Sequence, residues 1–310
     1  MIPQAPCRLL SSRKIDSSDS TYRLRPESDQ EITPSLTESI EKVGILHPPL
    51  LVKKKFRYII LSGRKRIQAV NKHGIENIPC FILDEKTGPS IKWQLLLSHA
   101  LIGSTLSIIE QANFFFKAES QLTEQQTLSL LPLLGIKPHA YKLKKFAMYR
   151  KLDQTTIDAL HSGHIQEKTG SKLSKLSSED QQTVVHLINH FKLSGSKQKK
   201  LITFVIDLIM RTKRPLKTIM SEWEKQQDIG QDNRPQQAMA CLHWLEGQCF
   251  PKRNAAEQEF QRFHHGLQLP ENMILQHTPS FEDNGLTLSI SFTDQSAFLK
   301  HWKNIKKHLK

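Results

Sequence analysis

The chain has 310 residues, and its 44 Lys and Arg exceed its 30 Asp and Glu, which gives a formal net charge of +14. That length suffices for two or three domains, and the charge favours a polyanionic partner, nucleic acid ahead of an anionic membrane surface. No apolar run approaches the length of a transmembrane helix, and the first residues contain no apolar core of signal-peptide length. We therefore expect a cytoplasmic protein with no membrane partner.

The cysteines give little sign of chemistry. The four cysteines include no Cys-x-x-Cys pair, and such sparse thiols suit a reducing compartment. Cys241, His243 and Cys249 lie near one another, but no fourth ligand follows at a spacing typical of zinc sites. The sequence predicts neither a metal site nor catalytic residues.

The first 104 residues alternate short apolar runs with amphipathic segments. Residues 1–25 predict a short strand near 7–10 followed by irregular chain, and residues 26–104 predict a small α/β domain. The expected elements of that domain are a helix from Pro34 that ends at Gly44, strands at 50–52 and 58–61, a helix at 64–73, a strand at 78–83 and an amphipathic linker helix at 90–101.

The turn after the second strand carries the cations of this domain. The strand ends at Ser62-Gly63, and the next helix begins with Arg64, Lys65 and Arg66. Free N–H groups at a helix start, the helix dipole and adjacent cations together favour an anion. The alternative is a tight strand-to-helix turn with solvated basic side chains. We predict that Gly63, Arg64, Lys65 and Arg66 bind phosphate or a nucleotide.

Residues 122–152 predict two helices joined by a turn at Gly135. Thr123 and Gln126 form a capping-box pattern, and Pro138 suits the first turn of the second helix, whereas Pro132 would kink the first helix near its end. The helical period places Lys142 and Lys145, with Tyr141 and Tyr149 beside them, opposite an apolar arc. That arc consists of Ala140, Leu143, Phe146 and Ala147.

A helix-turn-helix with one apolar and one basic face fits a reader of the DNA major groove, because one face docks on the domain and the other meets phosphates and base edges. The alternative is a solvated lysine-rich face. The predicted phosphate contacts are Lys137, Lys142, Lys144 and Lys145, and the predicted base or sugar contacts are His139 and Tyr141.

The rest of the predicted helical domain, 105–224, contains further amphipathic segments. Helices are expected at 107–119, 153–162, 166–175 and 178–191. The triplet Phe114–Phe116 indicates packing between domains, and His161 and His164 are expected to face solvent. The apolar run 201–210 predicts a buried core helix or an oligomer face.

A polar linker is expected at 225–237, and residues 238–310 predict a small α+β domain. Its expected elements are helices at 238–248, 254–266 and 294–310, strands at 273–276 and 286–292, and a turn at 283–285. The fold class is therefore α+β multidomain: a small α/β N-terminal domain, an all-helical middle domain with the helix-turn-helix, and a small α+β C-terminal domain.

The segment SLTESIEKVGILHPPLLV…YIILSGRKRIQAVNKHGIENIPCFIL resembles the N-terminal domain of ParB-type partition proteins. The helix LSIIEQANFF (106–115) is similar to the family's Leu-Asn-Pro-Ile-Glu-Glu-Ala helix, and residues 152–181 are similar to the segment after its recognition helix. The resemblance covers about residues 5–190. It implies a divergent ParB-type protein that is a nucleoid-associated dimer, binds double-stranded DNA in chromosome or plasmid segregation or in gene regulation, and works with a partition ATPase.

Many family members also bind and hydrolyse CTP with magnesium. This sequence departs from their pattern, since Arg64 stands where the family has Glu and Gln68 replaces its last arginine. The family's acidic segment matches about His99, Ala100 and Gly103, none of which offers the carboxylate oxygens that magnesium prefers. We expect a degenerate CTP pocket with weak or absent hydrolysis. The alternatives are an active CTP-hydrolysing clamp and a ParB-like transcriptional regulator.

The same N-terminal fold also resembles sulfiredoxin, whose chemistry needs a reactive cysteine at the strand-to-helix turn. The turn Ser62–Arg66 has none, and Cys80 lies within an apolar strand where a thiol is usually inert. ParB-type proteins often dimerise through a C-terminal domain, so the resemblance makes residues 238–310 a possible site of homodimerisation.

Overall fold

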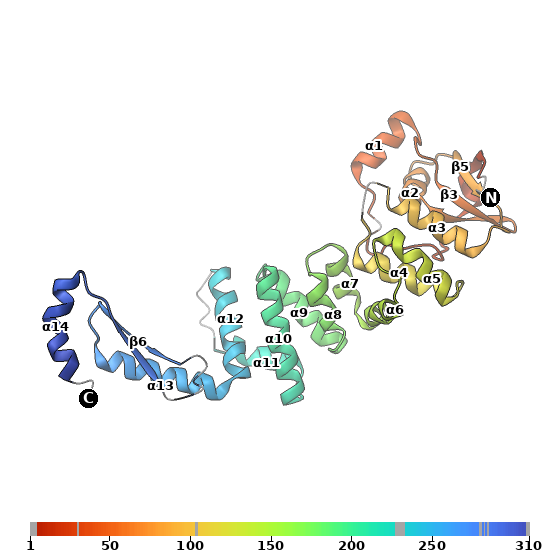
Figure 1. Cartoon of the computed structure of the whole chain (residues 1–310). Helices are drawn as coiled ribbons and strands as arrows, with labels where there is room; N and C mark the ends of the chain where they lie inside the picture. Colours follow the sequence, from red (N-terminus) through yellow and green to blue (C-terminus); the bar gives the residue numbers. More distant parts are fainter. Residues whose placement is uncertain are drawn as a thin grey trace. The chain divides into compact units, whose positions relative to one another are not determined.

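The computed structural model describes residues 5–29, 31–102, 105–226, 233–278, 281, 283 and 285–307, apart from the side chains of 303–305. The chain forms two compact units (Figure 1). The first is Met1–Ile202 with Pro215–Lys217, and the second is Thr203–Arg214 with Thr218–Lys310. The finer divisions at residues 25 and 104 and the linker at 225–237 stay predictions, and part of that linker, 227–232, lies outside the described residues.

A five-stranded mixed sheet forms the N-terminal part of the first unit. The strand order is β1-β5-β3-β4-β2, in which β3 is parallel to β5, β2 is parallel to β4, and the other pairs are antiparallel. The central strands form from apolar runs that are buried on both faces. The strands are β1 (Cys7–Ser11), β2 (Ile15–Asp16), β3 (Leu50–Lys54), β4 (Arg57–Ser62) and β5 (Asn77–Leu83).

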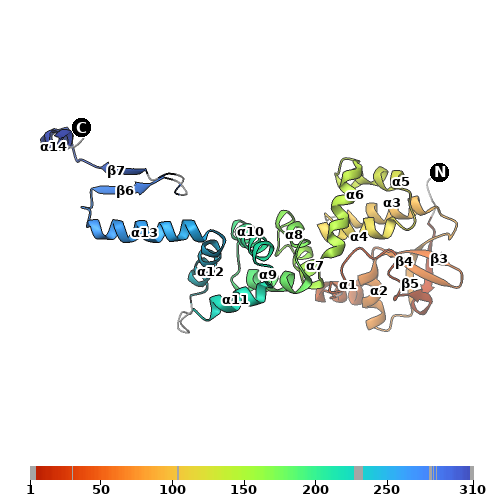
Figure 2. The ribbon, with the colours of Figure 1, turned by 90° about the horizontal axis from the view of Figure 1, so that it is seen from below.

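Helices cover both faces of this sheet. Figure 2 shows α2 (Arg64–Lys72) and α3 (Pro89–Ala100) on opposite faces, while α1 (Pro34–Val43) packs against α2. On the α2 face, Ile60 and Leu51 of the sheet share a hydrophobic cluster with Ile67. Trp93 and Leu97 of α3 are fully buried, so α3 is a core helix of the sheet and the expectation of an amphipathic linker is wrong.

The expectation of irregular chain after the first strand holds for residues 17–29 but not for residues 12–16. The strand β2 follows a short 3₁₀ turn (Ser12–Lys14), and Tyr22 and Leu24 are buried. The Tyr22 ring lies edge-on to Trp93, 5.1 Å between ring centroids. No periodic pattern marks this segment, because it is held by isolated side chains and not by one continuous face.

The helix pair at 122–152 is present in the first unit. It consists of α5 (Glu124–Leu130), a 3₁₀ turn (Leu131–Leu134) and α6 (Ala140–Ala147), which continues into a second 3₁₀ turn (Met148–Lys151). The Thr123–Gln126 capping box is formed, and Gly135 takes the left-handed conformation at φ 68°. Pro132 ends α5 by shifting the chain to 3₁₀ geometry. The second helix begins at Ala140 with His139 as N-cap, two residues later than Pro138 predicts.

The surrounding helices of the first unit follow the predicted order. They are α4 (Ile108–Ala118), α7 (Gln154–His161), α8 (Glu167–Leu173), α9 (Ser178–His190), α10 (Gly195–Thr212) and α11 (Leu216–Glu224), the last two of which extend into the second unit. The buried amides of Gln181 and Gln198 each donate to two loop carbonyls and accept one backbone N–H. Leu201, Val205 and Leu208 are buried, so the apolar run of α10 is a core helix.

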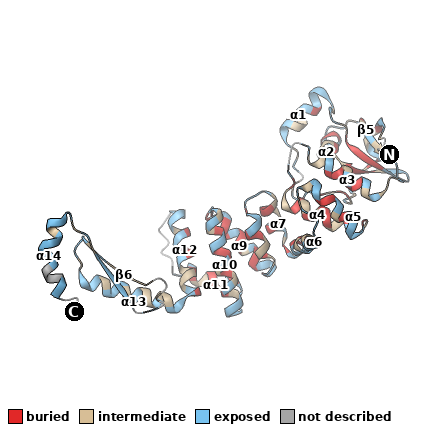
Figure 3. Cartoon of the chain, viewed as in Figure 1, coloured by how far each residue is buried: buried red, intermediate tan, exposed pale blue. Residues whose placement is uncertain are grey.

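The second unit ends in a helix–hairpin–helix segment. Its elements are α12 (Arg234–Cys249), α13 (Pro251–Leu267), β6 (Met273–His277), β7 (Leu286–Ile290) and α14 (Gln295–Lys307). Figure 3 shows that α13 and α14 are mostly exposed or intermediate, and no residue of α13 is buried. The predicted turn at 283–285 includes Asn284, which lies outside the described residues, as does Lys310.

Candidate functional site: an anion pocket and a basic helix

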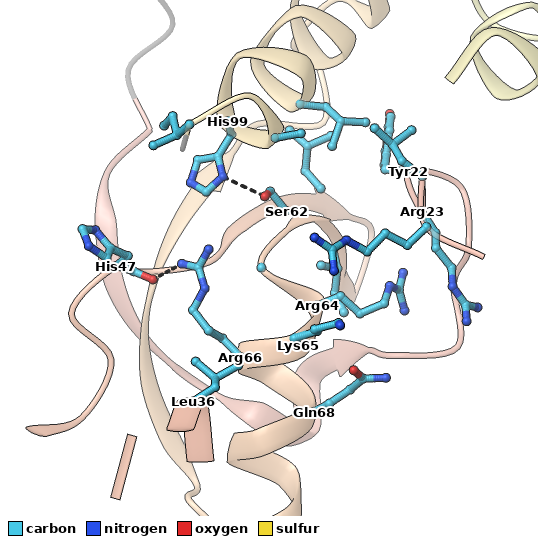
Figure 4. Close-up of a pocket in the computed structure, with 18 of the residues that line it drawn as sticks. Tyr22, Arg23, Leu36, His47, Ser62, Arg64, Lys65, Arg66, Gln68 and His99 are labelled. Carbon is cyan, nitrogen blue, oxygen red and sulfur yellow. Dashed lines mark hydrogen bonds between the residues drawn. The ribbon is translucent and has the colours of Figure 1, made fainter. Parts of the chain in front are cut away.

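A pocket of about 570 Å³ lies where the start of α2 meets the segment around residues 22–29. Figure 4 shows Arg64, Lys65 and Arg66 at its floor, with Arg23 reaching in from one side and His99 from α3 above. All four predicted phosphate-binding residues, including Gly63, therefore line one cavity. The structure places them together; what they bind stays a prediction.

Gly63 is required by the backbone of the turn. Its φ of 95° is a conformation that side chains disfavour, and a Cβ there would lie 2.8 Å from Pro49 Cβ. Pro49 is fixed by the extended segment before β3. The glycine thus lets β4 pass directly into α2 and directs the first turn of α2 at the pocket.

The three cations of the turn are held by protein oxygens. Arg64 donates to the backbone carbonyls of Ser17, at 2.7 Å, and Asp19, while Lys65 Nζ lies 2.7 Å from Asp29 Oδ1. Arg66 donates to the carbonyl of His47. Burial lowers the pKa of Arg66. Burial also lowers the pKa of Arg64, and the positive charge of Arg23 lowers it further. These guanidinium groups are partly desolvated, so an anion beside them would be bound more strongly than at an open surface.

No sequence pattern marks the other charged groups of the pocket. Arg23, Arg25 and Asp29 come from the segment expected to be irregular, and Glu110 comes from α4. Asp29 Oδ2 accepts from Arg25, at 2.9 Å, and Arg25 Nε lies 3.2 Å from Glu110 Oε1. These residues are missed because pairing between segments about 80 residues apart leaves no local pattern.

His99 occupies the position that the resemblance assigns to an acid. Its Nδ1 lies 2.9 Å from Ser62 Oγ (Figure 4), and burial, followed by the charge of Arg66, lowers its pKa. His99 is therefore neutral at pH 7 and is no hard oxygen ligand. Ala100 also lines the pocket, whereas Gly103 lies outside the described residues.

His161 does not face solvent, contrary to the expectation from sequence. Its side chain is 16% exposed, with Nε2 3.3 Å from Asp29 Oδ2 and Nδ1 2.8 Å from Ser107 Oγ. The imidazole thus joins α7 to the pocket wall and to the N-cap of α4. His164 is exposed and bonds Ser162, as expected for a turn.

The second predicted site lies at the N-terminal end of α6. The rings of His139 and Tyr141 stack at 5.8 Å, and Lys142 Nζ lies 5.1 Å from the Tyr141 ring centroid. Lys137 and Lys144 are exposed and, among the described residues, form no ion pair. Five of the six predicted DNA-contacting residues are therefore free to meet a ligand.

The sixth, Lys145, is engaged. Its Nζ lies 2.7 Å from Glu167 Oε1 of α8, so its charge is locally compensated. Tyr149 is also placed differently from the expectation, because it is buried and not beside the lysines. The 3₁₀ turn over 148–151 has three residues per turn, which brings Tyr149 into line with Phe146.

An aromatic row anchors α6 to the N-terminal part of the unit. Trp93 meets Phe114 edge-on at 5.5 Å, and Phe115 stacks on Phe146 at 4.3 Å. Phe116 lies under the guanidinium of Arg150, 4.5 Å from its carbon. The phenylalanine triplet thus packs between α3 and α6 within the first unit, and packing between domains stays a prediction. Only Phe146 of the predicted apolar arc is buried; Ala140 and Ala147 are exposed.

Among the described residues, no cluster of His, Cys, Asp or Glu has the arrangement of a metal site, and none of the helices is long and apolar enough to cross a membrane. Cys80 is fully buried, and burial raises its pKa to about 11, which keeps the thiol protonated. Cys80 therefore does not supply the reactive thiolate that sulfiredoxin chemistry needs.

Comparisons with known proteins find similarity to ParB-type proteins. Residues 8–98 match the family model of the ParB N-terminal domain. The chain is 25% identical over 187 residues to the probable chromosome-partitioning protein ParB of Campylobacter jejuni, a match that covers 60% of this chain and 65% of the relative. The chain thus spans less than two thirds of that relative's length.

Two solved structures of C-terminally truncated chromosome-partitioning protein ParB from Caulobacter crescentus are also similar. The one complexed with CTP-γ-S is 16% identical with a TM-score of 0.26, and the match covers 59% of this chain and 99% of that one. The one complexed to the centromeric parS site is 17% identical with a TM-score of 0.28, covering 63% and 97%.

Proposed function

Because this chain is a divergent ParB-type protein, we propose that it binds double-stranded DNA through α5 and α6 and acts in chromosome or plasmid segregation. The observation that carries the proposal is the cluster at the start of α6 of the exposed His139 and Tyr141 with the half-buried Lys142. Phe146 holds the opposite side of that helix in the core, so the cluster is presented on a rigid element.

The chemistry of this cluster suits a duplex. Lysines on phosphates give affinity and salt dependence without sequence preference, while the imidazole and phenol can meet sugar or base edges. Lys137 and Lys144 add exposed charge on either side. The second helix of a helix-turn-helix, with its N-terminal residues exposed, is the part that enters a major groove.

The test is binding of labelled duplex DNA by the full chain and by the double variant Lys142→Ala/Lys145→Ala. We expect the variant to bind more weakly and with a smaller dependence on salt. The matched control is Lys53→Ala/Lys86→Ala, which removes the same charge from exposed positions near the sheet. Unchanged affinity and salt dependence in the α6 variant would overturn the assignment of α6.

We propose that Gly63, Arg64, Lys65 and Arg66 bind the phosphates of a nucleotide, for which the resemblance implies CTP, and that hydrolysis is weak or absent. Five cationic side chains against two carboxylates line the pocket and support phosphate binding. The measurement is phosphate release from CTP with cognate DNA present. An ordinary turnover rate that Arg66→Ala abolishes would favour the active clamp instead.

We propose that residues 238–310 join two copies of the chain. The β6–β7 hairpin has one apolar face, on which Leu275 pairs with Leu288 and His277 pairs with Leu286. The Phe260 ring of α13 covers His277 at 4.7 Å, but Leu286 and Leu288 stay 50% exposed. A two-stranded hairpin whose apolar face is half exposed to water is only marginally stable by itself. We therefore expect the same face of a second copy of the chain to pack against it.

Sedimentation of the full chain tests the dimer. Leu288→Asp is expected to shift the protein towards monomer, and Thr287→Asp, on the polar face of the same strand, is the control. Equal sedimentation of both variants and the wild type would overturn the assignment of this face.

Segregation and transcriptional regulation differ in where the protein gathers. Genome-wide enrichment of bound DNA distinguishes them, because partition sites cluster near a replication origin or on a plasmid and regulatory sites lie at promoters. A Walker-type ATPase gene next to this one, and fluorescent foci on the nucleoid, are the outcomes expected for partition. Promoter-only enrichment would favour the regulator.

A further inference from the structure

The pocket at the start of α2 has a large excess of positive charge. Its described lining includes Arg23, Arg25, Arg64, Lys65 and Arg66 against only Asp29 and Glu110, an excess of three positive charges among the Arg, Lys, Asp and Glu side chains. Figure 4 shows Arg66 extending from the start of α2 towards His47 and Arg64 extending towards the side that carries Arg23, so the guanidinium groups lie on different sides of the pocket. In an ordinary site for a nucleotide with a divalent cation, acidic side chains would hold the metal and the cations would hold the phosphates.

Both carboxylates of the pocket are already used. Asp29 Oδ1 accepts a hydrogen bond from Lys65 at 2.7 Å. Asp29 Oδ2 accepts one from Arg25 at 2.9 Å and also lies 3.3 Å from His161 Nε2. Glu110 Oε2 accepts from the backbone N–H of Ser107 at 2.8 Å, and Oε1 lies 3.2 Å from Arg25 Nε. Each of the four carboxylate oxygens therefore has a donor, and a metal ion would have to break these contacts.

The remaining candidate position is His99. Its Nδ1 is bonded to the Ser62 hydroxyl, and an imidazole next to Arg66 is a poor ligand for magnesium, which binds oxygen in octahedral geometry. The donors that could act on a ligand are different. A guanidinium has five N–H donors, so a few hydrogen bonds leave others for a ligand. Among the described residues, Arg66 donates to the carbonyl of His47, Arg64 donates to the carbonyls of Ser17 and Asp19, and Arg23 donates to Glu27 Oε1 at 3.0 Å.

We propose that this pocket binds the polyphosphate of a nucleotide directly through the guanidinium groups of Arg23, Arg64 and Arg66, without a divalent cation. The proposal rests on the proposed phosphate binding at Gly63–Arg66. Guanidinium groups match phosphate oxygens in pairs, and three of them neutralise most of the charge of a triphosphate. Because magnesium chelates the same oxygens in solution, it competes with these arginines and does not assist them.

The experiment is calorimetric titration of the full chain with CTP, in magnesium and again in EDTA. We expect the affinity in EDTA to equal or exceed the affinity in magnesium. Binding that is about tenfold tighter in magnesium, or that occurs only there, would overturn the proposal. No binding in either solution would overturn both this proposal and the proposed nucleotide site, while DNA binding by α6 is measured separately and stands or falls by itself.

A pair of variants tests the position of His99. His99→Glu adds a carboxylate where the resemblance places a metal-binding acid. His99→Gln is the control, because glutamine has the shape of glutamate without its charge. We expect His99→Glu to bind CTP more weakly in EDTA and to regain affinity in magnesium, a dependence of about tenfold that His99→Gln lacks. Equal magnesium dependence in the two variants would overturn the proposal, provided that both unfold at the same temperature as the wild type.

Discussion

The most direct prediction concerns the unequal roles of two lysines on α6. Lys142 lies over the Tyr141 ring and has no carboxylate partner among the described residues, whereas Lys145 is paired with Glu167 at 2.7 Å. If α6 meets DNA, Lys142 can release a counterion from a phosphate, while Lys145 is already compensated. We expect Lys142→Ala to weaken DNA binding and the charge-neutral pair Lys145→Gln/Glu167→Gln to leave it nearly unchanged.

The size of the effect follows from counterion release. One phosphate contact changes the slope of log K against log salt by about 0.9, which at about 0.1 M salt corresponds to roughly 1.2 kcal/mol, or about eightfold in affinity. For each chain bound, Lys142→Ala should therefore reduce the salt slope by about 0.9 and the affinity by about eightfold. The double variant keeps the local net charge, so its slope should stay that of the wild type.

Fluorescence anisotropy of a labelled duplex, titrated between about 50 and 200 mM salt, measures both quantities. The reasoning is refuted when the slope of Lys142→Ala coincides with that of the wild type, or when Lys145→Gln/Glu167→Gln loses as much slope as Lys142→Ala does. Circular dichroism of each variant confirms that α6 is still folded, since Lys142 and Lys145 both lie outside the core.

Three further predictions concern stability. Phe146→Ala removes the ring stacked on Phe115, so urea unfolding should show a loss of about 3–5 kcal/mol in the first unit; a loss below about 1 kcal/mol would mean that α6 is not anchored there. Gly63→Ala strains φ and meets Pro49, so thermal unfolding should occur several degrees lower, whereas Gly135→Ala, which has no neighbour within 4 Å, meets only the φ strain and should cost less. Burial raises the pKa of Asp29, but hydrogen bonds from Lys65 and His161 lower it by more, to a net value below 3.8. The charged form of Asp29 therefore stabilises the folded protein at neutral pH, and this stabilisation is lost as the pH falls through the lowered pKa. The difference in unfolding temperature between the wild type and Asp29→Asn should therefore shrink below about pH 4.

Much of the fold could be read from local patterns. The Thr123–Gln126 capping box, the glycine that ends α1 and the apolar run of β4 act within a few residues, and each is formed as predicted. The four residues at the start of α2 were identified for the same reason: a strand that ends in glycine followed by three cations is a local signal. The burial of Tyr149 was missed, because a short 3₁₀ turn changes the angle between residues without a strong mark in the sequence. The start of α6 was placed two residues early, because Pro138 lies in extended chain before the helix.

By itself the sequence determined which segments are helix or strand, where the cations gather, and that the chain resembles ParB-type proteins. Only the tertiary structure decided which charges meet. Asp29 contacts Lys65 and His161, which are 36 and 132 residues away, and these contacts place the irregular segment in the pocket. Such partners are selected by packing of the whole unit, whereas propensity and periodicity act over a few residues. That distinction explains why the three cations at the start of α2 were foreseen, and why Arg23, Arg25 and the engagement of both carboxylates of the pocket were not.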